Sequence, residues 1–186
     1  MDDEAILTLF WARAESAIKE TAQKYGRHCI AIAMNILHSA EDAEECVNDT
    51  YLKVWDAIPP ARPTAFAAFI GRITRNLSLN RYKANRTQKR GGNTVTVLLE
   101  ELSDCLPARD TVESAYDESV VSRAISAFLY TERAEARQVF VRRYWYAESV
   151  AGIASRFGMG EGKVKSMLFR TRRRLRDYLE SEGISI

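Results

Sequence analysis

Carboxylate side chains form the first group in this sequence that could do chemistry. Asp42, Glu45 and Asp49 are spaced three and four residues apart, which places them on one face of a helix. Such a face can bind a divalent cation or dock on a basic protein helix, and Leu52 beside it favours docking. A face that is only solvated is the common alternative. No histidine or basic residue accompanies the carboxylates, as metal-dependent cleavage of nucleic acid would require.

Cations around an aromatic side chain form a second group. On a helical wheel centred on the apolar stripe at Val164, Phe169 lies about 140° from that stripe. The residues on this basic face are Lys165, Ser166, Phe169, Arg170, Arg173 and Arg176. An aromatic flanked by cations suits contact with a thymine methyl or a sugar, and the N–H groups at 161–163, next to Lys163, suit a phosphate. The alternative is a solvated helix whose Phe169 touches a neighbour.

A third group lies in residues 66–83, which contain basic residues and no acid. If Phe66, Phe69, Ile70, Ile73 and Leu77 form the buried stripe, the far side carries Arg72, Arg75, Leu79, Tyr82 and Lys83. Basic side chains mixed with an exposed aromatic suit a nucleic-acid strand whose bases are splayed and stacked. Packing of Leu79 and Tyr82 on another element is the alternative.

Motifs for catalysis and cofactors are absent from the sequence. It has no GxxxxGK[ST] phosphate loop, no HExxH and no Ser-His-Asp arrangement. Cys29, Cys46 and Cys105 are far apart and lack CxxC spacing, which argues against a disulfide framework or a zinc cluster. His28 adjoins Cys29, so the two side chains point to different helix faces. We expect no enzyme activity, no cofactor and no metal.

Charge is segregated along the chain. Residues 1–60 carry 5 basic against 11 acidic side chains, and residues 61–91 carry 8 against 0. Residues 92–130 then carry 2 against 7, and residues 131–186 carry 12 against 7. Two basic segments separated by an acidic one predict contact with a polyanion at two places, although any single charged block can be a solvated face.

The composition is that of an ordinary globular protein: 46% of the 186 residues are hydrophobic and 28% are charged. No stretch approaches the ~20 apolar residues of a membrane span. The chain opens with Met1 followed by the acidic residues Asp2, Asp3 and Glu4, unlike a signal peptide. We expect a cytoplasmic protein without membrane insertion.

The hydrophobic pattern is helical nearly throughout, which predicts an all-α fold of two small domains. Domains are expected at 1–90 and 113–186, joined by a flexible linker over 91–112 that contains Gly91, Gly92 and Pro107. Ser39 is a suitable N-cap, and Pro59-Pro60 ends the helix that it begins. The expected helices are 4–37 with a break near Tyr25-Gly26, 40–58, 64–90, 113–130, 131–146, 149–157 and 161–180.

Two of these helices have the spacing of a helix-turn-helix. Ala154 is small enough for the second helix to cross closely, and Gly158 can take the positive φ that a tight turn needs. The full set of matching positions is Val150, Ile153, Ala154, Phe157, Gly158, Met159, Val164 and Met167.

These segments, in this order, resemble a sigma factor of the sigma-70 family, of the extracytoplasmic-function (ECF) type. Residues 42–55 (DAEECVNDTYLKVW) resemble the family's region 2.2, and residues 66–83 (FAAFIGRITRNLSLNRYK) resemble regions 2.3 and 2.4. Residues 148–175 resemble region 4.2. The resemblance implies a promoter-specificity subunit of bacterial RNA polymerase, with a sigma region 2 bundle followed by a sigma region 4 helix-turn-helix.

The resemblance also implies partners and roles. Residues that would dock on the β′ clamp helices are Asp42, Glu45, Asn48, Asp49 and Leu52. Residues that would meet the −10 element are Arg72, Arg75, Leu79, Asn80, Tyr82 and Lys83, with loop 59–64 capturing a flipped base. Residues that would read the −35 element are Lys163, Lys165, Ser166, Phe169, Arg170 and Arg173. The β flap, promoter DNA and an anti-sigma factor are the further partners.

The sequence departs from the family pattern in several places. The family usually has Trp at Phe69 and Asp at Asn80, and often Gln and Glu at Asn48 and Asp49. The changes at Phe69 and Asn80 bear on the −10 preference, and those at Asn48 and Asp49 are shorter versions of the same docking chemistry. A free-standing helix-turn-helix regulator is the alternative function; it would bind a palindromic duplex without polymerase and would not need the basic segment 66–83.

Overall fold

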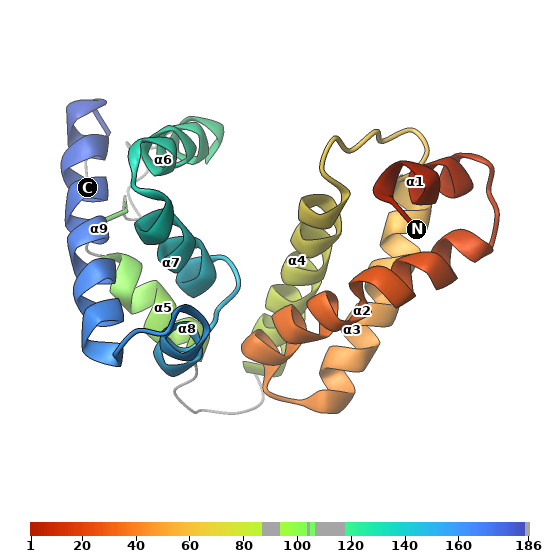
Figure 1. The fold of residues 1–186 in the computed structure, drawn as a ribbon, viewed down its shortest axis with the longest axis horizontal. Coiled ribbons are helices and arrows are strands. Elements are labelled where there is room, and N and C mark those ends of the chain that lie inside the picture. Colours follow the sequence, from red (N-terminus) through yellow and green to blue (C-terminus); the bar gives the residue numbers. More distant parts are fainter. Residues whose placement is uncertain (87–93, 104, 107–117, 185–186) are drawn as a thin grey trace. The chain divides into compact units, whose positions relative to one another are not determined.

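The computed structural model describes residues 1–86, 94–103, 105–106 and 118–184. This part of the chain is helical and contains no strand, so the predicted all-α fold is confirmed (Figure 1). The chain divides into two compact units, residues 1–91 and 92–186. Within the described residues, no helix is long and apolar enough to cross a membrane.

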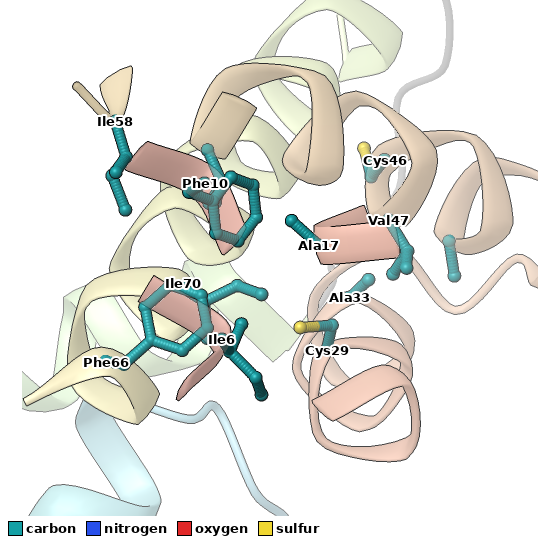
Figure 2. Close-up of a cluster of buried hydrophobic side chains, with 12 residues drawn as sticks. Ile6, Phe10, Ala17, Cys29, Ala33, Cys46, Val47, Ile58, Phe66 and Ile70 are labelled. Carbon is teal, nitrogen blue, oxygen red and sulfur yellow. The ribbon is translucent and has the colours of Figure 1, made fainter. Parts of the chain in front are cut away.

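The described residues of the first unit form a bundle of four helices: α1 (Asp3–Trp11), α2 (Ser16–Leu37), α3 (Ala40–Ala57) and α4 (Phe66–Arg86). The long helices α2, α3 and α4 all pack on one another, and α1 packs on α2. Figure 2 shows the resulting core, in which Phe10 of α1 and Phe66 of α4 lie with ring centroids 6.0 Å apart. Burial of such side chains is the main force that holds the bundle together.

Two helix boundaries in this unit show how local sequence acts. The predicted cap of α3 is confirmed, because Ser39 Oγ accepts a hydrogen bond from the backbone N–H of Asp42 at 3.3 Å. The predicted break near Gly26 is wrong: the chain turns between α1 and α2, where Arg13 has a φ of 53°. Gly26 lies inside α2, and a Cβ there would stand 3.3 Å from Tyr51 Oη of α3. This glycine therefore serves close packing rather than a helix end.

The buried face of α4 differs from the predicted one. Ile70, Thr74 and Ser78 are buried, and so is Tyr82 at 8% exposure. These residues follow i, i+4 spacing, and such a row drifts about 40° around a helix at each step. A row that begins at Phe66 therefore reaches Tyr82 four steps later. The prediction that Tyr82 is an exposed aromatic is wrong, because α4 packs along this drifting row against both α2 and α3.

Small polar residues are buried in that row because their hydroxyls are satisfied locally. Thr74 Oγ1 donates to Ile70 O at 3.0 Å, and Ser78 Oγ donates to Thr74 O at 2.8 Å. Thr50 of α3 lies against Thr74, with Oγ1 atoms 3.3 Å apart. Hydroxyls that bond to the carbonyl four residues earlier can enter a core at little cost. A wheel that scores only apolar residues misses them.

The second unit contains α5 (Thr94–Ser103), α6 (Glu118–Thr131), α7 (Ala134–Tyr144), α8 (Val150–Phe157) and α9 (Glu161–Ser181). Helix α9 packs on α6, α7 and α8. The predicted helix over 113–130 begins at Glu118 in the structure, and residues 113–117 lie outside the described part. The predicted end of α4 at residue 90 also falls outside it.

Helix α5 lies where the sequence predicted a linker over 91–112. The structure has a regular helix over Thr94–Ser103 and includes it in the second unit. Leu98 of α5 is buried, while Val97 and Leu99 are exposed. The prediction of a linker is wrong for these ten residues. One of them, Glu101, pairs with Arg143 about forty residues away in the chain, and such a partner leaves no local signal.

Candidate nucleic-acid interface and docking face

Helices α8 and α9 form a helix-turn-helix. Ser149 caps α8 by accepting a hydrogen bond from Gly152 N at 3.0 Å. Gly158 ends α8 with a φ of 61° and ψ of 35°, so the left-handed turn predicted from the sequence is confirmed. The Met159 N–H closes the turn on Ala154 O at 2.9 Å. This turn fixes where α9 begins and which of its faces points outward.

The outward face of α9 carries the predicted DNA-contacting side chains. Val164, Leu168, Thr171 and Leu175 are buried in the predicted stripe. Phe169 is 59% exposed. All six predicted residues are exposed: Lys163, Lys165, Ser166, Phe169, Arg170 and Arg173. An exposed aromatic among cations can touch base edges while the cations bind phosphates.

Ion pairs on this face leave its cations available. Lys163 Nζ lies 3.6 Å from Glu135 Oε1, and Lys165 Nζ lies 4.0 Å from Glu161 Oε2. These side chains are all more than half exposed, and exposed pairs of this kind contribute only ~0–1 kcal/mol. Arg170 donates from Nε to Ser166 O of its own helix at 3.2 Å, which leaves the rest of its guanidinium facing outward. Phosphate oxygens can replace such weak partners.

On the acidic face of α3, some carboxylates bind an arginine of α4 and other residues are exposed without a described ion pair. Arg81 of α4 donates from Nε to Asp42 Oδ1 at 2.7 Å and from Nη2 to Glu45 Oε2 at 2.5 Å. The hydrogen bond from Arg81 holds the pKa of Glu45 below its usual value. Asn48 and Asp49 are exposed. Leu52 of the same helix is 58% exposed.

The predicted −10 residues of α4 differ in their exposure to solvent. Arg72, Asn80 and Lys83 are exposed, whereas Arg75 and Leu79 are half-buried. Burial lowers the pKa of the Arg75 guanidinium from its usual value, which still leaves it charged at neutral pH. Tyr82 is buried and cannot present a ring to a base without a change in α4 packing.

Comparison with protein families gives two matches, one in each unit. The model described as Sigma-70 region 2 matches residues 21–88, which cover most of α2 and all of α3 and α4. The model described as Sigma-70, region 4 matches residues 133–175, which cover α7, α8 and most of α9. The order and content of the two matches agree with the resemblance inferred from the motifs.

The chain belongs to the sigma-70 family.

Relatives with established names agree on the type of sigma factor. The ECF RNA polymerase sigma factor SigL of Mycobacterium tuberculosis is 29% identical over 184 residues, covering 94% of this chain and 96% of the relative. SigE of Mycolicibacterium smegmatis, also an ECF sigma factor, is 27% identical and covers 86% of this chain and 60% of the relative. This sigma factor is therefore of the ECF type, a promoter-specificity subunit of RNA polymerase.

Solved structures similar to this sigma factor include a complex of two proteins. It is the sigma factor RpoE of Bartonella quintana in complex with the anti-sigma factor NepR. The sequence identity is 19%, the match covers 89% of this chain and 98% of that one, and the TM-score is 0.38.

The free-standing regulator is not favoured for this sigma factor. Such a protein needs the helix-turn-helix, and the region 4 match covers it. The region 2 match adds most of α2 together with α3 and α4, including the basic segment 66–83 that a simple duplex binder would not use.

Sequence reasoning missed two residues of this sigma factor that organise charge. Arg81 joins the acidic face of α3 to α4. Glu101 of α5 holds Arg143 of α7, with Oε1 and Nη2 2.6 Å apart. Both pairs span about forty residues of chain, so neither could be found from local spacing. The absence of acids in 66–83, which leaves Arg81 with no partner in its own helix, is the one signal that pointed to a distant carboxylate.

Proposed function

We propose that this sigma factor binds core RNA polymerase through α3 and promoter DNA through α4 and α9. The observation that supports this most is a pair of oppositely charged faces, each with one exposed apolar side chain. Leu52 lies on the acidic face of α3 and Phe169 on the basic face of α9. Exposed apolar side chains within charged faces are typical of interaction surfaces.

The docking contact with the β′ clamp helices uses the exposed part of α3, namely Asn48, Asp49 and Leu52. Leu52 enters an apolar hollow of the partner helix, and Asp49 pairs with a basic residue there. Asp42 and Glu45 join the contact only if a basic partner residue competes with Arg81, because both carboxylates already bind it.

The DNA contacts divide between the two units. Lys165, Ser166, Phe169 and Arg170 enter the major groove of the −35 element, and Lys163 and Arg173 bind phosphates. Arg72, Arg75, Leu79, Asn80 and Lys83 lie along the −10 strand. Opening of the duplex draws its free energy from captured bases and phosphate contacts, so the protein needs no catalytic residue of its own.

The remaining features of the proposal follow from the family. The protein works in the cytoplasm, where the polymerase is, and region 4 also contacts the β flap. An anti-sigma factor that covers one or both units holds it inactive.

The docking contact can be tested by binding of the full chain to purified core enzyme. The double variant Asp49→Asn, Leu52→Ala should weaken binding at least tenfold, since buried interface side chains contribute roughly 1–3 kcal/mol each. Glu4→Gln is the control: it removes an exposed carboxylate from α1 instead of α3 and should leave binding unchanged. Absence of core binding by the unaltered chain would refute the proposed function.

A further inference from the structure

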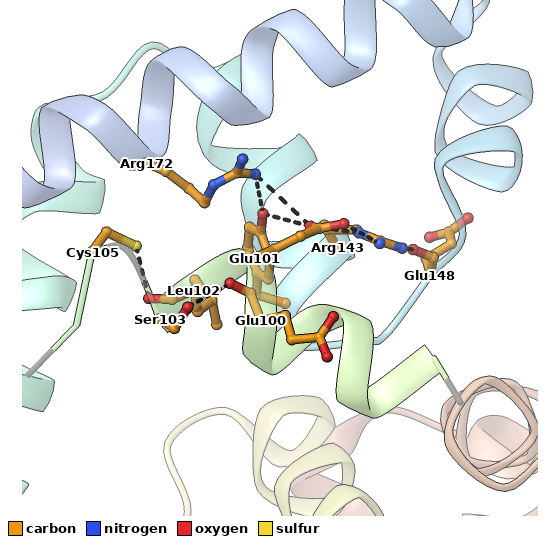
Figure 3. Close-up of polar contacts among 9 residues, drawn as sticks. Glu100, Glu101, Leu102, Ser103, Cys105, Arg143, Glu148 and Arg172 are labelled. Atoms are coloured by element: carbon orange, nitrogen blue, oxygen red, sulfur yellow. Dashed lines mark hydrogen bonds and ion pairs between the residues drawn. The ribbon is translucent and has the colours of Figure 1, made fainter. Parts of the chain in front are cut away.

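The carboxylate of Glu101 joins α5 to two helices of the second unit (Figure 3). Arg143 of α7 donates to it from Nη2 at 2.6 Å and from Nε at 3.2 Å. Tyr144 Oη donates at 2.9 Å, and Arg172 Nη1 of α9 lies 3.8 Å away. Arg172 also donates to Tyr144 Oη at 2.6 Å. One carboxylate therefore holds groups from α7 and α9 at the same point.

The same network reaches the start of the helix-turn-helix. Arg143 Nη1 donates to the backbone oxygen of Glu148 at 3.2 Å, and Glu148 directly precedes Ser149, the N-cap of α8. The Glu148 side chain is itself held by Arg142 at 3.3 Å and Arg156 at 3.0 Å. Arg143 thus connects Glu101 to the segment that precedes α8, because it donates hydrogen bonds to both.

Burial of the Arg143 side chain makes the charge of Glu101 necessary for the stability of this unit. The Arg143 side chain is only 7% exposed, and a buried guanidinium without a charged partner is strongly unfavourable. Burial alone would raise the pKa of Glu101, but the bonds from Arg143 and Tyr144 and the charge of Arg172 outweigh it and leave that pKa below its usual value. Glu101 is therefore ionised at neutral pH and balances the buried cation.

We propose that Glu101 is a positioning residue for recognition of the −35 element, and that α5 is a working part of the DNA-reading unit rather than a spacer. Through Arg143, Glu101 sets the position at which α8 begins. Through Arg172 it holds α9, and the residue after Arg172 is Arg173, which is proposed to bind phosphate. Glu101 itself does not touch DNA. The inference rests on the proposed function, in which α9 reads the promoter.

Glu100 provides a matched control within the same helix. Its side chain is exposed, and its carboxylate points away from the cations that surround Glu101 (Figure 3). Glu100→Gln and Glu101→Gln each raise the net charge of the chain by one. Any general gain in attraction to DNA is therefore the same in both variants, and the difference between them isolates the network.

The experiment compares these full-chain variants, each bound to core enzyme. The first DNA probe is a promoter fragment selected by the unaltered holoenzyme, and the second is the same fragment with its −35 segment scrambled. The measured quantity is the ratio of the two affinities. Glu100→Gln should keep the ratio of the unaltered protein, whereas Glu101→Gln should lower it about tenfold because the hydrogen bonds that orient α8 and α9 are lost. Equal ratios for the two variants would overturn the inference.

The ratio separates positioning from mere loss of folded protein. Partial unfolding lowers the active fraction and reduces both affinities by the same factor, which leaves their ratio unchanged. If Glu101→Gln does not fold, Tyr144→Phe replaces it, because that change removes only the hydroxyl between Glu101 and Arg172. It should lower the ratio by about threefold, and an unchanged ratio would count against the inference. If the unaltered holoenzyme does not distinguish the two fragments, the proposed reading of the −35 element fails instead.

Discussion

Phe169 is the residue whose placement is hardest to explain by folding alone. It is 59% exposed on α9, while the apolar residues needed for packing are buried on the opposite side. Replacement by Ala should therefore weaken binding to the −35 element about tenfold, or ~1.4 kcal/mol, by removing an apolar contact with the groove. The melting temperature should stay the same. Fluorescence anisotropy of the holoenzyme on promoter DNA measures the first effect.

Tyr130→Ala is the control for this prediction. Tyr130 is an aromatic of the same unit and is 81% exposed, but it lies on α6 and is not among the proposed groove contacts. It should bind DNA as the unaltered protein does. Equal losses for the two variants, or none for Phe169→Ala, would contradict the role given to Phe169.

Residue placement could be predicted from sequence where the buried residues of a helix keep to one stripe. The wheel for α9 correctly buried Val164, Leu168 and Leu175 and exposed Phe169. It failed for Tyr82 in α4, whose buried row turns around the helix between two neighbours. The difference is physical: the buried residues of α9 stay in one stripe although the helix contacts three others, whereas the buried row of α4 turns around its helix.

At the scale of elements, the turn between α8 and α9 depends on Gly158. Its φ of 61° is one that a side chain disfavours, so Gly158→Ala should destabilise the second unit by about 1 kcal/mol. Gly162→Ala makes the same chemical change inside the first turn of α9, where a Cβ would meet nothing within 4 Å. It should be neutral or stabilising by up to about 1 kcal/mol. Thermal unfolding of both variants tests the pair, and equal shifts would contradict the turn geometry.

Charge pairs between elements predict a pH dependence. The pKa of Glu101 is below its ordinary value in the folded protein, so its stabilising effect is complete above the unfolded pKa, near 4.5. That effect is lost as the pH falls through the lower folded value. The difference in unfolding temperature between the unaltered protein and Glu101→Gln should be constant from pH 7 to about 5 and shrink below that. A difference that persists unchanged to pH 3 would mean that the charge of Glu101 does not stabilise the unit.

Elements could be predicted from sequence where their signals are local. The cap at Ser39, the turn at Gly158 and the bounds of α8 and α9 follow from residues within a few positions of each boundary. Helix α5 and the pair of Arg81 with Asp42 depend on partners about forty residues away. Spacing within one segment carries no information about such partners.

For the whole molecule, the alternation of charge along the chain has a consistent interpretation. The acidic block includes the α3 face, and the two basic blocks include the outer sides of α4 and α9. Acidic side chains would be repelled by DNA and basic ones attracted to it. A sigma factor needs both, because it must bind a protein machine and a promoter at the same time.

Transcription by core RNA polymerase on a promoter library, with and without this chain, tests the central claim most directly. Mapped start sites should appear only when the chain is present, and the fragments that support them should share two short sequence elements upstream. Start sites that do not depend on the chain, or a chain that binds a palindromic duplex in the absence of polymerase, would contradict it.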